Sequence, residues 1–123
     1  WLIEQAGLWA DRLSINLELP THASLERLAP EKNGPGIENA MGQMHERIQE
    51  AREERRRFAP AGQSTQIIIG ADETSDADVL QACAKLYESF KLKRIYYSAF
   101  SPIEEASRLL PSNPPPLARE HRL

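Results

Sequence analysis

Three stretches of the chain have the hydrophobic pattern of β-strands. Apolar and polar residues alternate strictly over residues 13–19, so one face of this strand is apolar and the other polar. The isoleucines at 67–69 form a continuous apolar run that ends at Gly70, which is typical of a parallel strand covered on both faces. Residues 94–100 are rich in aromatic and β-branched side chains and predict a third strand. The polar face of the first strand carries Ser14, Asn16 and Glu18.

Helical periodicity fills the segments between these strands. Thr21 is a suitable cap for a short helix that reaches residue 28. Apolar residues near one stripe then predict a long helix over residues 37–58. The clearest helix follows Ser75, with Asp78 in the return position of a capping box. Its apolar stripe comprises Val79, Leu80, Cys83, Leu86, Tyr87 and Phe90.

The alternation of strands and helices defines the predicted fold class. Strands joined by crossover helices form parallel units whose carboxyl ends lie at one edge of the sheet. Three strands are too few to close a barrel. We therefore predict an α/β fold, a partial parallel (β/α) barrel of about three strands with crossover helices. Glu18, residues 70–73 and residues 100–102 should meet at its carboxyl edge, where α/β folds bind ligands.

The two ends of the chain give weaker patterns. Residues 1–9 have helical spacing with Gly7 as the expected stop, and residues 101–110 predict a helix with a proline in its first turn. The prolines at 114–116 can continue neither a helix nor a central strand. We expect residues 111–123 to be a flexible tail, and residues 1–123 to be a single piece of a longer protein.

Composition narrows the function classes. A chain of 123 residues that is 41% hydrophobic suits one small globular domain, and its net charge of −3 gives no overall basic field for nucleic acid. The single cysteine, Cys83, excludes an internal disulfide or a multi-cysteine metal site within the chain and fits a reducing compartment. No apolar run is long enough to cross a bilayer, and no charged-then-apolar leader opens the chain. We expect a cytoplasmic protein without a membrane partner.

Two polar features have simple structural explanations. The arginines within residues 52–57 lie near a helix carboxyl end, where they complement the macrodipole and pair with glutamates, so we favour that role over nucleic-acid binding. His22 lies in the first turn of the short helix, and we interpret it as an exposed surface residue and not as a catalyst.

The second strand resembles a known family pattern. Residues 66–73 are similar to the fifth-strand pattern of radical S-adenosylmethionine enzymes, glycine-x-isoleucine-x-glycine-x-x-glutamate, with Gln66 in place of the first glycine. Residues 14–18 resemble the fourth strand of that family, and residues 94–102 resemble the sixth. The chain would therefore supply roughly strands four to six of the family's barrel.

Three longer runs narrow the resemblance. Residues 11–21, 58–71 and 96–102 resemble radical S-adenosylmethionine proteins linked to DNA modification or repair. These proteins are also described as biotin-synthase-related and as DNA-binding proteins with a helix-hairpin-helix motif. No such motif is visible in this chain.

The resemblance implies a set of cofactor contacts. Asn16 and Glu18 would bind the ribose or methionyl part of S-adenosylmethionine, and Ile68 would pack on the adenine. Gly70 would let the backbone approach the ligand. The full set implied is Asn16, Glu18, Ser64, Gln66, Ile68, Gly70, Glu73, Ser98 and Phe100.

The resemblance also implies what this chain lacks. The family holds a four-iron four-sulfur (4Fe-4S) cluster on three cysteines after its first strand, and this chain has none of them. We therefore expect no catalytic and no metal-binding residue in the chain, no cofactor stably bound to the chain alone, and at most weak binding of S-adenosylmethionine. The full-length enzyme would cleave S-adenosylmethionine reductively to a 5′-deoxyadenosyl radical, which abstracts hydrogen from a nucleic-acid base or nucleotide. Nucleic acid would be held by regions outside this chain, and exposed strand edges would favour a homodimer.

Two other function classes remain open. The chain could belong to a (β/α) barrel lyase or aldolase in which Glu18 and a strand-end lysine or histidine do acid-base work. No lysine ends a predicted strand and His22 is one turn too far along, so we rank this class second. A binding domain that keeps the barrel without the cluster is the third class. A cysteine triad spaced x3 then x2 upstream of Trp1 would favour the radical enzyme over both.

Overall fold

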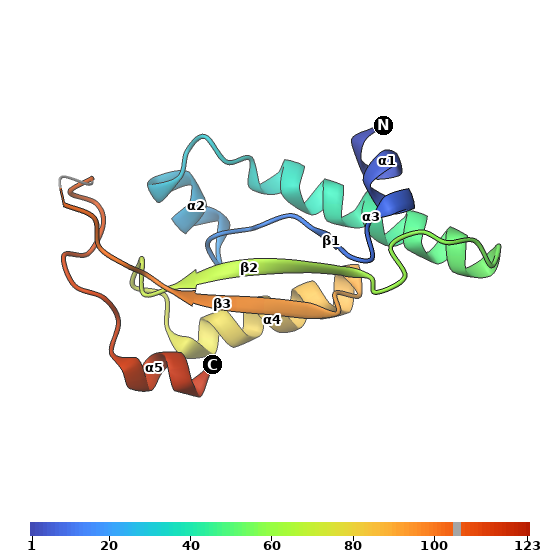
Figure 1. The fold of residues 1–123 in the computed structure, drawn as a ribbon. Coiled ribbons are helices and arrows are strands. Elements are labelled where there is room, and N and C mark those ends of the chain that lie inside the picture. Colours follow the sequence, from blue (N-terminus) through green and yellow to red (C-terminus); the bar gives the residue numbers. More distant parts are fainter. Residues whose placement is uncertain (105–106) are drawn as a thin grey trace.

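The computed structural model describes residues 1–104 and 107–123. These residues form a mixed α/β structure in which a three-stranded, open parallel sheet is flanked by helices (Figure 1). The predicted α/β class and parallel strands are confirmed, and the sheet is open, as three strands require; that it is an arc of a barrel stays a prediction. In chain order the elements are α1 (Leu2–Trp9), β1 (Leu13–Ser14), α2 (His22–Leu28), α3 (Gly34–Glu53), β2 (Gln63–Ile69), α4 (Asp76–Phe90), β3 (Arg94–Ala99) and α5 (Leu117–Arg122).

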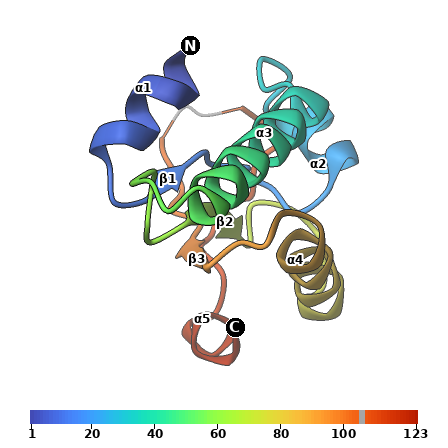
Figure 2. The ribbon, with the colours of Figure 1, turned by 90° about the vertical axis from the view of Figure 1, so that its right-hand side faces the viewer.

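The two long helices, α3 and α4, cover the same face of the sheet (Figure 2). Ile67 and Ile69 of β2 point to this face and are buried with Met41 of α3 and Val79 of α4 in the main hydrophobic core. Because side chains alternate along a strand, Ile68 points to the opposite face, where it is only half-buried. The expected burial of β2 is therefore complete on this face, whereas on the opposite face Ser64 is buried and Gln66 and Ile68 are half-buried.

Gln63 ties the two long helices to the start of β2. Its side chain is 1% exposed, and its amide nitrogen donates hydrogen bonds to the carbonyl oxygens of Met41 and Phe90, at 3.0 and 2.8 Å. Met41 belongs to α3, and Phe90 is the last residue of α4. One buried amide thus fixes where both helices lie on the sheet.

The first strand is shorter than the alternation predicts. β1 covers only Leu13–Ser14, and the chain meets β2 again at a bridge between Glu18 and Ile67. Between these points the side chain of Thr65 replaces the backbone ladder, since its hydroxyl donates to Ile15 O at 2.8 Å and accepts from Leu17 N at 3.0 Å. The alternation of burial persists, with the predicted apolar face buried at Leu13, Leu17 and Leu19.

The ends of α1 and α3 differ from the prediction, and the Phe58 ring lies between these two helices. α3 ends at Glu53, and Phe58 lies beyond it, packed against α1. Gly7 is inside α1 and does not end it. A Cβ at Gly7 would lie 2.1 Å from the Phe58 ring, so glycine is required there by packing. Of the other apolar residues on the predicted stripe of α3, Ala40 is half-buried and the rest are buried: Ile37, Met41, Met44, Ile48 and Ala51.

The predicted start and core face of α4 are confirmed. Ser75 and Asp78 form the reciprocal capping box. Cys83 is 3% exposed, and its thiol accepts a hydrogen bond from the Tyr97 hydroxyl at 3.3 Å. Burial raises the pKa of the Cys83 thiol, which keeps it protonated and unreactive. Leu80 and Tyr87, predicted on the same stripe, are exposed instead.

The chain after β3 departs most from the prediction. The described residues of the expected helix at 101–110 form turns and no helix, while residues 105 and 106 lie outside the described part. Ile103 and Leu109 are exposed, so these two residues provide no packing that would stabilise a helix there. A helix, α5, forms instead within residues 111–123, the segment predicted to be a tail.

None of the helices in the described ranges is both long enough and apolar enough to pass through a membrane.

Candidate functional site

The carboxyl ends of the three strands meet at one edge of the sheet. The Glu18 amide donates to Gln66 O at 3.0 Å, and Glu18 O accepts from the Ile68 amide at 2.7 Å. On the other side of β2, the Phe100 amide donates to Ile69 O at 2.8 Å. Glu18, Gly70 and Phe100 therefore share this edge, as the sequence predicts.

The remaining predicted residues lie mainly on the sheet face that α3 and α4 leave uncovered. Gln66 pairs with Tyr96 and Ile68 with Ser98 in the parallel register, so each pair points to the same side of the sheet. Gln66, Ile68 and Ser98 are half-buried, and Asn16 is exposed beside them. This face therefore offers amide and hydroxyl groups around one aliphatic side chain.

Two predicted residues are less well placed. Ser64 is on the same face, but it is 3% exposed and lies about 13 Å before Ile68 along the strand. Glu73 is exposed in the loop between β2 and α4. Neither borders the common edge as closely as Glu18 or Phe100 does.

A small apolar cluster lies under the edge. Leu19, Leu25 and Ala71 are buried there, and Ile68 and Phe100 pack against them while remaining partly exposed. Ile68 and Phe100 thus keep part of their apolar surface exposed at this edge, which suits contact with an aromatic ring.

Glu18 has an unusual backbone conformation. Its φ of 73° is left-handed, which costs a residue with a Cβ about 1 kcal/mol or more. Its carboxylate is partly exposed and lies 3.9 Å from the Lys32 ammonium. Strain of this kind is common at binding sites, where the surrounding structure holds it.

Asp72 is a site residue that sequence reasoning did not single out. Its Oδ1 accepts from the Thr74 amide at 3.0 Å, whereas its Oδ2 is buried without a hydrogen-bond partner in the described structure. Burial raises the pKa of Asp72, but the polar groups of Ser24 and Thr74 and the charge of Arg27 lower it by more, so it stays below its ordinary value. Asp72 is therefore an ionised acceptor two residues beyond Gly70.

The C-terminal segment covers Gly70. Gly70 has a φ of 84°, and a Cβ there would lie 2.6 Å from the Cβ of Pro115. The place where a ligand would approach the backbone is thus filled by a proline of the same chain. No sequence pattern indicates this contact, because it joins residues far apart in the chain.

Two arginines of α5 latch this segment to α4. Arg119 and Arg122 both pair with Asp76, and Arg119 also donates to the carbonyl oxygen of Thr74. Hydrogen bonds from both arginines lower the pKa of Asp76. The latch therefore forms with ionised Asp76 and is lost as pH falls through this lowered pKa, below the ordinary value of 3.8.

We predict that Asp76→Asn opens the latch. Without the carboxylate, Arg119 loses an ionic partner, and trypsin should cleave after Arg119 several-fold faster, as mass spectrometry of timed digests would show. Asp11→Asn is the matched control, because it removes an exposed ion pair with Arg57 elsewhere and should not change cleavage at Arg119. Equal cleavage rates in the wild type and Asp76→Asn would contradict the claim that Asp76 holds α5 in place.

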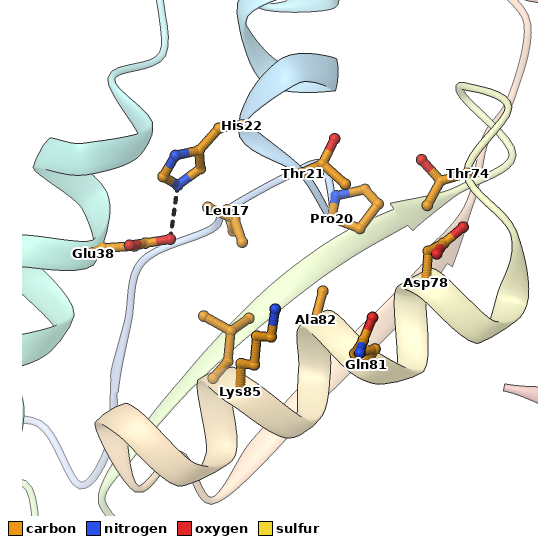
Figure 3. A pocket seen from close by; sticks show the side chains of 11 residues that line it. Leu17, Pro20, Thr21, His22, Glu38, Thr74, Asp78, Gln81, Ala82 and Lys85 are labelled. Carbon is orange, nitrogen blue, oxygen red and sulfur yellow. Dashed lines mark hydrogen bonds and ion pairs between the residues drawn. The ribbon is translucent and has the colours of Figure 1, made fainter.

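A separate groove of about 400 Å³ lies on the opposite side of the sheet, between α2, α3 and α4 (Figure 3). His22 and Glu38 form a 2.8 Å pair at one wall, and Lys85 projects from α4 at the other. None of the predicted cofactor residues lines it. Several of its polar residues are exposed, and His22 and Glu38 already pair with each other, so we favour the open sheet face as the functional site.

Within residues 1–104 and 107–123, no cluster of three or more histidine, cysteine or acidic residues could hold a metal ion. Comparison of the chain with protein-family models, curated proteins and solved structures found no match.

Proposed function

We propose that this chain forms part of the S-adenosylmethionine pocket of a radical enzyme. The observation that carries the proposal is the common edge of Glu18, Gly70 and Phe100, next to an uncovered sheet face with Gln66 and Ser98. Amide, hydroxyl and carboxylate groups around an apolar surface suit a ribose and an adenine. In the intact enzyme this sheet would be an arc of a (β/α) barrel, with the uncovered face turned inward.

Each part of the ligand has a partner of suitable chemistry. The Glu18 carboxylate and Asn16 amide suit the ribose hydroxyls or the methionyl ammonium group. Ile68 and Phe100 give the apolar surface for the adenine. Asp72 lies near the same edge, but its unpartnered oxygen is buried, so it would reach a ligand only after the loop that follows β2 moves.

Occupation of the pocket requires a local rearrangement. Pro115 fills the space beside Gly70, so a ligand that touches this backbone must displace the C-terminal segment. Opening the latch at Asp76 would favour that displacement.

The chain's residues do not fit the ligand set of an iron-sulfur cluster. Cys83 is the single cysteine, and it is buried beneath Tyr97 on the helical side of the sheet. In the proposed enzyme residues outside this chain would hold the cluster, which would supply electrons for the reaction. This chain's residues would bind and orient the cofactor. Nucleic acid as the substrate follows from the resemblance alone and stays a prediction.

Equilibrium dialysis with labelled S-adenosylmethionine tests the proposal. Because the chain supplies only about half of the pocket, it should bind S-adenosylmethionine weakly, with a dissociation constant on the order of 1 mM. Ser98→Leu should abolish binding because it places a bulky side chain on the uncovered face. Lys85→Ala is the control, since it changes the groove on the other side and should leave binding unaltered. Micromolar binding without a cluster, or equal loss in both variants, would overturn the half-pocket assignment.

A further inference from the structure

One face of α1 is apolar, uncharged and exposed. Trp1 and Trp9 are 89% and 83% exposed, more than any other large hydrophobic side chain among the described residues. Leu2 and Leu8 are exposed as well, and so is Gln5. The spacing i, i+1, i+4, i+7 and i+8 places these side chains on one side of a helix, with the residue at i+4 in the middle. We name them the α1 stripe: Trp1, Leu2, Gln5, Leu8 and Trp9.

The other face of α1 holds the helix against the rest of the molecule. Ile3 packs against a buried cluster that includes residues of α3, and Gly7 lies against the Phe58 ring. Glu4 is the one charged residue within Leu2–Trp9, and it pairs with Arg47 of α3 at 3.2 Å. α1 is thus fixed at the outside of the molecule, beside α3 (Figure 2). Packing within the chain accounts for this inner face and leaves the α1 stripe without a role.

The α1 stripe has the same order of side chains in both directions. Trp1 and Trp9 are equally far from Gln5 along the chain, and so are Leu2 and Leu8. If two copies of α1 cross antiparallel at Gln5, Trp1 therefore meets Trp9 of the second copy. Leu2 then meets Leu8 of the second copy, and Gln5 meets its own equivalent. This is the self-complementary contact that a twofold axis requires.

Each of these pairs is chemically favourable. Two tryptophan rings attract each other in offset or edge-to-face arrangements, and leucine side chains pack without burying a charge. Two glutamine amides satisfy each other at the axis, because each has donors and an acceptor. A buried aromatic side chain hides about 150–250 Å², so the tryptophans of both copies would bury roughly 600–1,000 Å². With the leucines and glutamines the contact reaches about 1,200 Å², the lower end of stable interfaces.

The strand edges, where the sequence favours a homodimer, are less open to a second copy. At one edge, the Ile95 amide of β3 already donates to the Tyr87 hydroxyl at 3.1 Å, and α5 lies beside this strand. At the other edge, β1 is only two residues long. The α1 stripe, in contrast, is left uncovered by the described residues.

We propose that the chain forms a twofold homodimer through the α1 stripe, with the two α1 helices antiparallel. The symmetric order of the side chains favours a second copy over a foreign partner, because a foreign partner places no such requirement on the stripe. An interface of this size suits a dissociation constant on the order of 10 µM. The stripe contains no residue assigned to the cofactor, so this proposal and the proposed function can fail separately.

Sedimentation velocity over about 1–500 µM protein measures the association. Tryptophan fluorescence reports on the same surface, because Trp1 and Trp9 are the two tryptophans of the chain. The decisive variants are Gln5→Glu and Gln5→Lys, alone and mixed in equal amounts. Gln5 is exposed, so both variants should fold, which circular dichroism checks. Gln81→Glu, at an exposed position of α4, is the matched control, and neutral lipid vesicles test whether a membrane covers the stripe instead.

We expect the wild type and Gln81→Glu to dimerise with dissociation constants within about twofold of each other, and their tryptophan emission to move to shorter wavelength. Gln5→Glu and Gln5→Lys should each associate at least about tenfold more weakly, because a charge then meets its own copy at the axis. The mixture should regain the wild-type affinity, since opposite charges then face each other.

Four results would each overturn the proposal. They are a monomeric wild type at about 500 µM, an unaltered affinity of Gln5→Glu, no rescue in the mixture, and an emission shift that requires vesicles. A monomeric wild type would mean that a different partner covers the α1 stripe.

Discussion

Thr65→Val should destabilise the protein by about 2 kcal/mol or more, despite the nearly equal volumes of the two side chains. The hydroxyl bridges Ile15 O and Leu17 N where the β1 ladder is interrupted. Valine leaves both backbone groups without this partner, and the Leu17 amide is buried. Urea denaturation followed by circular dichroism measures the loss.

Thr65→Ser separates the hydrogen bonds from packing. Serine keeps the hydroxyl and removes one methyl group, so it should cost only about 1 kcal/mol. A serine variant less stable than the valine variant would mean that packing, and not the hydroxyl bridge, dominates at this fully buried position.

Gly7→Ala should destabilise by about 2 kcal/mol, although alanine normally favours a helix over glycine by about 1 kcal/mol. The added Cβ would lie 2.1 Å from the Phe58 ring, so α1 or the ring must move. Thermal unfolding monitored by circular dichroism would show a lower midpoint.

Gly42→Ala is the matched control for this prediction. Gly42 lies inside α3, and the nearest atom to an added Cβ is the Phe90 Cε1, at 4.0 Å. There alanine should stabilise by up to about 1 kcal/mol. Shifts of both midpoints in the same direction would contradict the steric account at Gly7.

The elements that could be predicted are those specified by local chemistry. The Ser75 and Asp78 capping box begins α4 where the sequence indicates, because both partners lie within one turn. The isoleucine run forms a central strand, and alternating burial persists across residues 13–19. Parallel order then places Glu18, Gly70 and Phe100 at one edge. Hydrophobic periodicity and the parallel strand order were therefore enough to predict that these three residues lie at one edge.

The features that could not be predicted depend on partners far away in the chain. The interruption of β1 depends on a hydroxyl of β2, and the course of α1 depends on the Phe58 ring. Ile103 and Leu109 have helical spacing but are exposed, while α5 is held by Asp76. At the candidate site, the contact between Pro115 and Gly70 could not be predicted either, because no residue near Gly70 in the sequence indicates it.

The most direct test of the account is an amide-resolved NMR titration with S-adenosylmethionine. The account predicts that the largest shifts, in fast exchange, are those of Glu18, Gln66, Gly70, Ser98 and Phe100. Resonances of α5 should move with them, because the ligand displaces Pro115 from Gly70. Shifts concentrated in the groove around His22 and Lys85, or no shifts at millimolar ligand, would contradict it.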